Sequence, residues 1–211
     1  MTTDAQDDDA PAIAPEGLVL PAPLWDAVRA AYRSPGRAYH DLAHVREVLR
    51  RFDEAARAVG WARPREAFFA LLYHDAIYVV GSHDNEGESA ELATAALARW
   101  LPDAGLDGDR VAQLIRLTAR HGTLTRAELD DDAALFVDCD MAILGSAPAT
   151  FDAYDRAIRD EYAIVPAELF RAGRRHFFER LLASERIFFS RYFFDELEQA
   201  ARANLLRVLS A

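Results

Sequence analysis

The sequence predicts an all-α fold, a single bundle of about seven to nine helices given the usual lengths of helices. Two observations favour this fold. Apolar residues recur every three or four positions over long stretches, which marks helices with one buried face. Strand-like alternation is scarce, and the best run, 77–80, is too short and isolated to build a sheet. The length of 211 residues and the apolar content of 51% suit one domain with a substantial core.

The first elements follow from local composition. Residues 1–16 are rich in Asp, Ala and Pro and have no periodic apolar pattern, so we expect a disordered acidic tail before a folded domain over 17–211. Gly60 ends the first clear helical segment, and Pro64 can open the next helix in its first turn. The apolar face of that first segment is formed by Leu42, Val45, Leu49, Phe52, Ala56 and Val59.

Helix breakers divide the rest of the chain in the same way. The polar loop 81–85, the connector 102–108 and the segment 145–148 separate further helices, and Pro166 opens another. Two more helical faces are formed by Val111, Leu114, Ile115 and Thr118, and by Phe194, Leu197, Ala201, Leu205 and Val208. An aromatic run indicates core or a homodimer face rather than a cofactor pocket, and consists of Phe188, Phe189, Tyr192, Phe193 and Phe194.

The composition excludes several kinds of function. The net charge of −11 argues against binding along a nucleic-acid polymer, although a small phosphorylated substrate remains compatible with it. All 24 cationic residues are arginine, which excludes a P-loop lysine, a Schiff-base lysine and a Ser–Lys dyad. The single cysteine, Cys139, can form neither an internal disulfide nor a Cys-rich metal site. No apolar run is long enough to span a bilayer and the acidic start is unlike a signal peptide, so we expect a cytoplasmic protein without a membrane partner.

Three groupings of histidine and aspartate point to a metal site. His40 and His44 are four residues apart at the start of a predicted helix, a spacing that can put both imidazoles on one face. His74 and Asp75 end the apolar helix that contains 68–73. Two hydrophilic groups at the end of a buried stretch need a partner, and a divalent cation is such a partner.

The third grouping consists of Asp138 and Asp140, which flank Cys139 within an apolar predicted helix. A carboxylate in such a helix needs a metal, an arginine or a water cluster. Together the groupings offer imidazole and carboxylate ligands from distant helices, a mixture that suits Mn, Fe, Co, Ni or Zn, with Mg as a further option. One or two such ions would lower the pKa of bound water and create a hydroxide near neutral pH.

The order His, His-Asp, Asp on successive helices resembles the HD-domain superfamily. This resemblance implies that the metal ligands are His44, His74, Asp75 and Asp140. From about residue 20 onward the chain is similar to a bacterial family of predicted metal-dependent HD phosphohydrolases. The matching segments are 39–44, 74–78, 84–86, 89–90, 118–121, 138–145, 159–162 and 201–204.

The segment 39–44 also resembles the Tyr-His-Asn-x-x-His segment of class I cyclic-nucleotide phosphodiesterases, which are HD proteins. That likeness implies that His40 is the general acid and His44 a ligand. Asp41 stands where those enzymes have Asn, and the glutamine that holds their purine has no clear counterpart here, which argues against cyclic-nucleotide specificity. The same segment imitates a zinc-protease helix, but that interpretation leaves the other two groupings unexplained.

Candidates for a second shell lie further along the chain. The HD resemblance implies that Asp84 and Glu86 orient the attacking water, whereas a helix N-terminus would explain them by capping and dipole effects. His121 ends a predicted helix, where it either serves a second metal or a phosphate, or interacts with the helix dipole. His83 and His176 are interpreted as structural or solvated.

Two arginines are candidate phosphate clamps, because a guanidinium matches phosphate oxygens with two hydrogen bonds. They are Arg159 and Arg174. The alternative is a surface ion pair of little energetic value with Asp155, Glu161 or Glu179.

These observations predict a metal-dependent phosphohydrolase, a phosphomonoesterase or phosphodiesterase that acts on a small phosphate ester or nucleotide. Asp75 would bridge the ions if two bind, and His40 would give a proton to the departing alkoxide. The first alternative is a di-iron oxygenase of HD type, in which His83 or His121 would bind the second metal. The second is a non-catalytic nucleotide-binding HD module, whose expected mark is the loss of ligands, whereas all four are present here.

Overall fold

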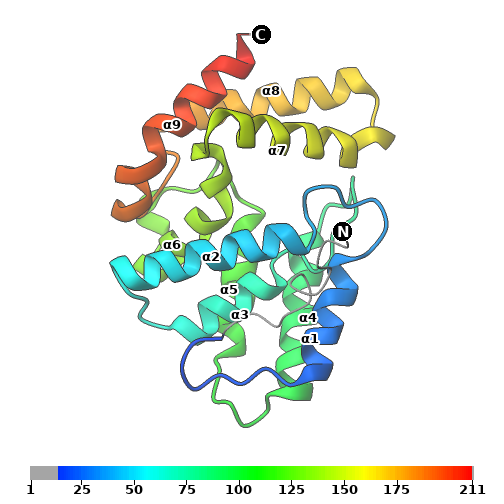
Figure 1. Cartoon of the computed structure of the whole chain (residues 1–211), viewed down its shortest axis with the longest axis vertical. Coiled ribbons are helices and arrows are strands. Elements are labelled where there is room, and N and C mark those ends of the chain that lie inside the picture. The colour runs from blue at the N-terminus through cyan, green and yellow to red at the C-terminus, as the bar shows by residue number, and fades with distance from the viewer. Residues whose placement is uncertain (1–13, 211) are drawn as a thin grey trace, which may run out of the picture.

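The computed structural model describes residues 14–210 and confirms an all-α fold within them (Figure 1). The described residues form nine α-helices and several short 3-10 helices, without a strand. The elements are α1 (Ala22–Tyr32), α2 (Leu42–Ala58), α3 (Pro64–Tyr73), α4 (Asn85–Trp100), α5 (Gly108–Thr118), η2 (Arg126–Glu128), α6 (Asp131–Met141), η3 (Ala142–Gly145), α7 (Pro148–Glu161), η4 (Tyr162–Ile164), α8 (Ala167–Ala183) and α9 (Arg191–Leu209).

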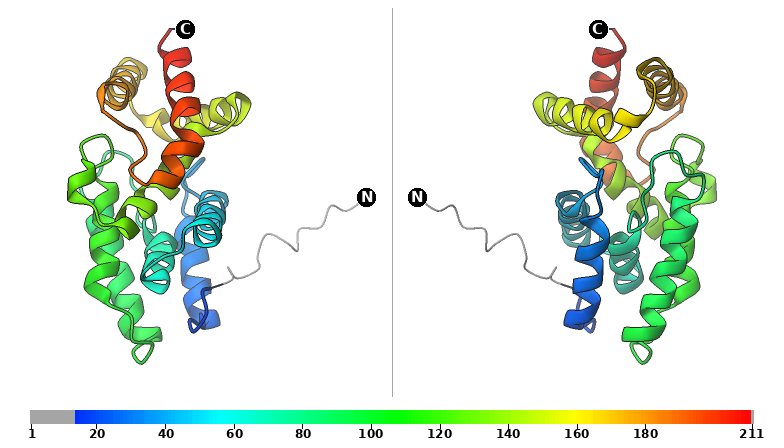
Figure 2. Two further views of the ribbon diagram at one scale, coloured as in Figure 1. Left: turned by 90° about the vertical axis from the view of Figure 1, so that its left-hand side faces the viewer. Right: turned by 90° about the vertical axis from the view of Figure 1, so that its right-hand side faces the viewer.

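The helices form two groups along the long axis of the molecule. Helices α7, α8 and α9 lie together at one end, and α1 to α5 lie at the other, with α6 and η3 between them (Figures 1 and 2). Helix α3 contacts α2, α4, α5 and α6, and η3 contacts α7 and α9. The segment from α6 to η3 therefore connects the two groups.

Helix α3 is the centre of the first group. Every residue from Ala67 to His74 is buried, whereas an amphipathic helix would expose one side. Its N-terminus is fixed by the buried carboxylate of Asp132, which accepts hydrogen bonds from the backbone N–H groups of Ala62 at 2.9 Å and Arg63 at 2.7 Å. Because α3 is enclosed on all sides, the polar residues at its C-terminal end are held deep in the molecule.

The junction between the two groups depends on close backbone packing. A Cβ atom at Gly145 would lie 2.6 Å from Leu197 Cβ and 3.0 Å from the Leu197 carbonyl oxygen. The side chain of Asn204 donates hydrogen bonds to the carbonyl oxygens of Leu144 at 3.0 Å and Ser146 at 2.9 Å. Helix α9 therefore fits against η3 only because a residue without a side chain stands at 145.

The predicted helical segments are confirmed in their positions. The periodic faces that begin at Leu42, Val111 and Phe194 lie on α2, α5 and α9, and Pro64 is the first residue of α3. The end of the first face is wrong: Ala56 is exposed, and Val59 follows α2 and is 59% exposed, because the buried side of the helix runs from Phe52 to Ala55. Of the predicted tail, residues 1–13 lie outside the described part, and Ala14 packs against the core. The aromatic run contributes to the core with Phe188, Phe189 and Phe193, while Tyr192 and Phe194 are partly buried against it.

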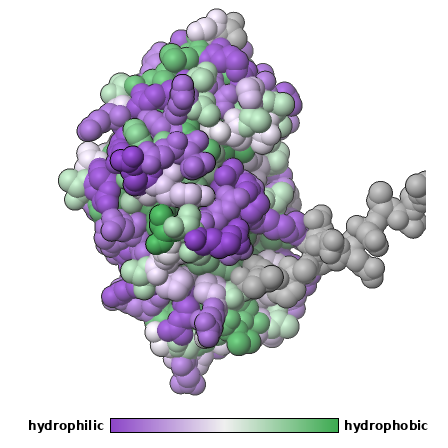
Figure 3. Space-filling view, turned by 60° about the vertical axis from the view of Figure 1, so that its left-hand side comes forward, coloured by the Kyte–Doolittle hydropathy of each residue, from purple (hydrophilic) through white to green (hydrophobic). Residues whose placement is uncertain are grey.

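The described surface is largely hydrophilic on the face drawn in Figure 3, where hydrophobic residues form small separate patches. Within residues 14–210, no single helix has the length and hydropathy to cross a membrane. One pair of segments, Asp131–Gly145 and Pro148–Ile164, meets that test only when taken together, and it is bent by 104° at its break.

Candidate metal centre

Four of the predicted ligands come together at the junction of three helices. His44 lies in the first turn of α2, His74 and Asp75 follow the last residue of α3, and Asp140 lies in the last turn of α6. One ligand atom from each of them lies within 4.8 Å of all the others. The four side chains therefore form a cluster that could hold a metal ion.

The distances within the cluster suit a single ion. The two Nε2 atoms of His44 and His74 are 2.9 Å apart. Asp75 Oδ2 lies 3.1 Å from His74 Nε2 and 3.5 Å from His44 Nε2. Asp140 Oδ1 lies 3.3 Å from His44 Nε2 and 3.6 Å from His74 Nε2. For ligand distances of about 2.0–2.2 Å, neighbouring ligands are about 3.3–3.6 Å apart in a tetrahedron and about 2.8–3.1 Å apart in an octahedron.

The electrostatics of the cluster also suit a cation. Burial alone would raise the pKa values of Asp75 and Asp140, but the neighbouring histidines hold both well below their usual range, so both carboxylates are ionised. Burial would likewise lower the pKa of His74, and the two carboxylates raise it instead. Neutral imidazoles whose Nε2 atoms face each other at 2.9 Å repel unless a proton or a metal ion lies between them. Two carboxylates and two imidazoles fit a divalent cation in both charge and donor type.

Hydrogen bonds behind the cluster orient its members. The Nδ1–H of His74 donates to the Leu71 carbonyl oxygen at 2.8 Å, which leaves the Nε2 lone pair for the cluster. His121 Nε2 donates to Asp140 Oδ2 at 2.8 Å, so the other oxygen of Asp140 is directed at the histidines. His44 has no such support, because its buried Nδ1 has no partner.

A half-buried arginine, Arg37, fixes the backbone on one side of the cluster. Arg37 Nη1 donates to the carbonyl oxygens of His40 at 2.6 Å and Asp75 at 2.8 Å, and its Nη2 donates to the carbonyl oxygen of Ala76 at 2.9 Å. The hydroxyl of Tyr32 accepts the backbone N–H of Asp75 at 3.2 Å. The loop before α2 and the end of α3 are thereby tied together, which sets His40 beside the cluster.

His40 is held in one orientation by a buried carboxylate. Its Nδ1 lies 2.7 Å from Glu161 Oε2, and its Nε2 lies 4.0 Å from Asp75 Oδ2. The other oxygen of Glu161 accepts the backbone N–H groups of Ala38, Tyr39 and His40, each at 2.8 Å. Burial would raise the pKa of Glu161, but the bonds from His40 and the backbone lower it to about 2. Glu161 is therefore a carboxylate at neutral pH, and the free Nε2 of His40 faces the cluster.

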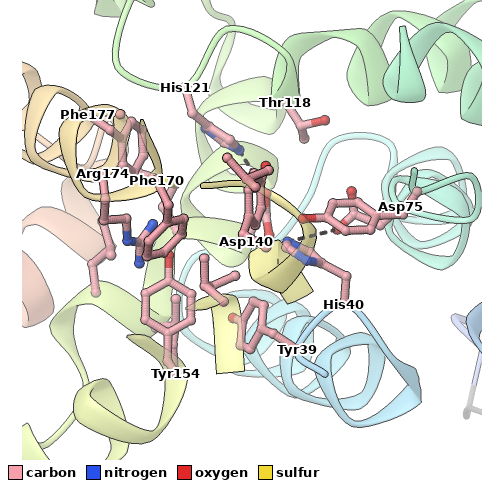
Figure 4. A pocket seen from close by; sticks show the side chains of 18 of the residues that line it. Tyr39, His40, Asp75, Thr118, His121, Asp140, Tyr154, Phe170, Arg174 and Phe177 are labelled. Atoms are coloured by element: carbon pink, nitrogen blue, oxygen red, sulfur yellow. Dashed lines mark hydrogen bonds and ion pairs between the residues drawn. The ribbon is translucent and has the colours of Figure 1, made fainter. Parts of the chain in front are cut away.

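The cluster opens onto a cavity of about 440 Å³ (Figure 4). His40, Asp75 and Asp140 line one end of it, with His121 and Thr118 beside them. The other end is lined by residues of α7, η4 and α8, among them Tyr154, Tyr162, Phe170, Arg174 and Phe177. A small molecule in this cavity can therefore touch the cluster and the aromatic end at once.

Some of the predicted second-shell residues line the cavity beside the cluster, and others lie away from it. Glu86, His121 and Arg174 line the cavity. Asp84 does not: it is exposed, and it occupies the N-cap position of α4 without a side-chain capping bond. Arg159 does not line the cavity either, because its side chain is 65% exposed and lies 3.9 Å from Asp155 Oδ2.

The carboxylate of Asp138 does not belong to the cluster that contains Asp140. It accepts the backbone N–H groups of Phe189 at 2.8 Å and Ser190 at 2.7 Å, and the hydroxyl of Ser190 at 2.6 Å. The partner we expected for a carboxylate in this helix was a metal, an arginine or water, and for Asp138 it is a loop backbone. Residues two apart on a helix face different sides, which separates Asp138 from the cluster.

Sequence analysis missed Glu161 as a site residue and the aromatic end of the cavity. The sequence predicted Glu161 only as a possible ion-pair partner of an arginine, although the segment 159–162 was part of the HD resemblance. Its proximity to His40, 121 positions away, had no local signal. Comparison with family models, with curated proteins and with solved structures finds no match. The functional argument therefore depends on the geometry of the site.

Proposed function

We propose that the protein is a metal-dependent phosphohydrolase of HD type that acts on a small phosphate ester or nucleotide. The observation that carries this proposal is the cluster of His44, His74, Asp75 and Asp140 at the wall of a cavity, with the free Nε2 of His40 beside it. A divalent cation held by the cluster would act as a Lewis acid that lowers the pKa of water and neutralises phosphoryl charge. Mn, Fe, Co, Ni, Zn and Mg all suit these ligands.

The side chains around the cluster have separate roles in the proposed reaction. Water attacks phosphorus, and the bond from phosphorus to the alcohol oxygen breaks. His40 donates its Nε2 proton to that oxygen, and the proton released by the attacking water returns the histidine to its starting state. Glu161 accepts from Nδ1 and stabilises the imidazolium, while its backbone bonds keep the ring in place. His121 keeps Asp140 oriented.

The placement of the other histidines favours a hydrolase over the oxygenase alternative. A second metal would need further ligands from His83 or His121. His83 is exposed and does not line the cavity, which leaves His121 as the one histidine of that interval beside the cluster in the described structure. A non-catalytic module would need neither an oriented His40 nor its buried carboxylate partner. These contacts support the hydrolase as the proposal.

Reloading experiments test the proposal. Protein stripped with a chelator is reloaded with each ion, and hydrolysis of 4-nitrophenyl phosphate and bis(4-nitrophenyl) phosphate is followed by the release of 4-nitrophenol. We expect turnover with at least one ion and none without. Full activity of the stripped protein, or of the Asp75→Ala variant, would contradict the proposed function.

The role of His40 is tested by changing the leaving group. A general acid matters most when the departing alkoxide is basic. We expect His40→Ala to lower kcat by about 10²–10⁴-fold for phenyl phosphate and far less for 4-nitrophenyl phosphate, whose leaving group needs little protonation. The exposed His176 provides the control, because His176→Ala should change neither rate. Equal losses for both substrates would remove His40 from the role of proton donor.

A further inference from the structure

The end of the cavity away from the cluster has the chemistry of a recognition site. In Figure 4 the side chains of Phe170, Phe177 and Arg174 lie on the opposite side of the cavity from Asp75. The rings of Tyr162 and Phe170 are 5.5 Å apart, and Tyr154 lies below Phe170 in the view of Figure 4. Aliphatic side chains also line the cavity, namely Ile143, Leu144, Ile158, Val165 and Leu169. Such a surface favours a flat or apolar group over a hydrated one.

Arg174 brings hydrogen-bond donors into this apolar end. Its side chain is only 14% exposed, and its Nε donates to Asp155 Oδ1 at 3.0 Å. The guanidinium carbon lies 4.3 Å from the centroid of Phe178 and 4.8 Å from that of Tyr154. A guanidinium has five N–H donors and Asp155 accepts from one of them, so Arg174, which lines the cavity, has donors left for an acceptor at this end.

The charge around Arg174 decides which acceptor fits. Asp155 is 13% exposed and already neutralises the guanidinium. Within the part of the chain that the structure describes, Arg174 is the only arginine that lines the cavity. An anionic group here would therefore add an uncompensated charge to an apolar region, whereas a carbonyl oxygen or a ring nitrogen would not. The neutral acceptor is the better match.

The volume of the cavity limits the size of the ligand. A volume of about 440 Å³ lies within the range of about 300–1,000 Å³ that is usual for small-molecule sites. Leu169 lines the cavity and is 65% exposed, so the apolar surface continues to the rim. A ring system with a short substituent fits between the cluster and Arg174.

We infer that the alcohol part of the substrate is a flat ring with a neutral hydrogen-bond acceptor, which stacks among the aromatic side chains of α7, η4 and α8 and accepts from Arg174. The inference rests on the proposed function for the identity of the substrate as a phosphate ester. The recognition itself is independent of turnover, because the alcohol alone should bind at this end.

Binding of naphthols to the chelator-treated protein tests this inference. The probes are 2-naphthol, its 6-acetyl derivative and 6-hydroxy-2-naphthoate, and binding is measured by calorimetry. We expect the acetyl compound to bind about 10- to 100-fold more tightly than 2-naphthol, the effect of one hydrogen bond to a charged donor. Equal affinities of these two would overturn the inference. Tighter binding of the naphthoate than of the ketone would overturn the assignment of a neutral acceptor.

Variants assign the effect to Arg174. Arg174→Met removes the donors and keeps the apolar bulk, and Arg174→Leu is a second variant without a donor if the first does not fold. Both should bind 2-naphthol and its acetyl derivative alike. Arg159→Met is the matched control, because Arg159 approaches the same Asp155 but does not line the cavity, and it should keep the preference. A preference that survives both substitutions at 174 would contradict the inference.

The aromatic surface has its own test. Phe170→Ala should weaken both neutral naphthols by a similar factor, because it removes a stacking ring and not the donor. Unchanged affinities in this variant would overturn the stacking arrangement. Failure of the protein to hydrolyse any phosphate ester would contradict the proposed function, and it would leave the comparison of naphthols to be judged on its own result.

Discussion

Replacement of Glu161 by glutamine tests the link between α7 and the loop before α2. The carboxylate accepts three backbone N–H groups and the Nδ1–H of His40, and its side chain is 0% exposed. Glutamine keeps the shape but loses the charge, and its NH₂ group cannot accept from a donor. The substitution should therefore lower the free energy of unfolding without opening a cavity.

The expected magnitude follows from the pKa of the carboxyl group. The folded protein lowers the pKa of Glu161 from 4.5 to about 2. At about 1.4 kcal/mol per pKa unit this shift corresponds to roughly 3 kcal/mol. Glutamine Oε1 can still accept backbone N–H groups and part of the interaction is screened, so we expect Glu161→Gln to lower the free energy of unfolding by about 2 kcal/mol at pH 7.

The lowered pKa of Glu161 also predicts how the loss of stability in the variant changes with pH. A carboxyl group whose pKa is lower in the folded state stabilises the fold above its unfolded pKa, and that stabilisation is lost as the pH falls through the folded value. For Glu161 the window runs from 4.5 down to about 2. The difference between wild type and variant should therefore shrink as the pH falls from about 4.5 toward 2.

Urea unfolding followed by circular dichroism, with a chelator present, measures this difference at each pH. The exposed Glu196 provides the control, since Glu196→Gln should change the free energy of unfolding by less than about 0.5 kcal/mol. A loss below about 0.5 kcal/mol for Glu161→Gln, or a loss that grows toward acid pH, would refute the reasoning.

Three further predictions concern the cluster and the packing around it. Asp140→Asn should abolish the rise in melting temperature that an added divalent ion gives to the stripped protein, while His176→Ala should keep it; a full rise in Asp140→Asn would argue against this ligand. Gly145→Ala should lower the free energy of unfolding by about 1–3 kcal/mol, because the new Cβ would lie 2.6 Å from Leu197 Cβ. Gly173 provides the control, because a Cβ there, in the middle of α8, would meet nothing within 4 Å. Gly173→Ala should leave the free energy of unfolding unchanged or raise it by up to about 1 kcal/mol. Similar losses of stability at both glycines would show that packing is not the cause. Asp132→Ala should cost about 1–2 kcal/mol in urea unfolding because it leaves two N–H groups at the start of α3 unpaired, and a neutral effect would show that they find other acceptors.

The helices and the three groupings of histidine and aspartate could be predicted because their signals are local, whereas the choice of His44, His74, Asp75 and Asp140 as one cluster came from the resemblance to HD proteins. The spacing of apolar residues indicates a helix face wherever it occurs, and Pro64 indicates the start of α3. The adjacent His74 and Asp75 at the end of a fully apolar helix are conspicuous because such groups need a partner. Convergence of the three helices came from the resemblance to HD proteins, since no local pattern states which helix ends meet.

The parts that could not be predicted depend on contacts between distant segments. Arg37 reaches the backbone at Asp75 and Ala76, 38 and 39 positions away, and nothing in its neighbourhood distinguishes it from the other arginines. The sequence likewise offers no pattern that distinguishes Arg159 from Arg174 as a residue of the site. The fold separates them, because Arg174 lies on the side of α8 that faces Tyr154 and the cavity, while Arg159 lies on the exposed side of α7.

The division of the site between the two groups of helices has a consequence for specificity. The cluster belongs to α2, α3 and α6, which are fixed by the buried core around α3. The aromatic end belongs to α7, η4 and α8, which meet the first group through η3 and through Glu161. If the proposed function holds, substitutions at Phe170 or Arg174 should therefore change which alcohol is bound without altering the distances among the four side chains of the cluster. Glu161 is the exception, because it lies on α7 and orients His40, so a change there should affect binding and proton transfer together.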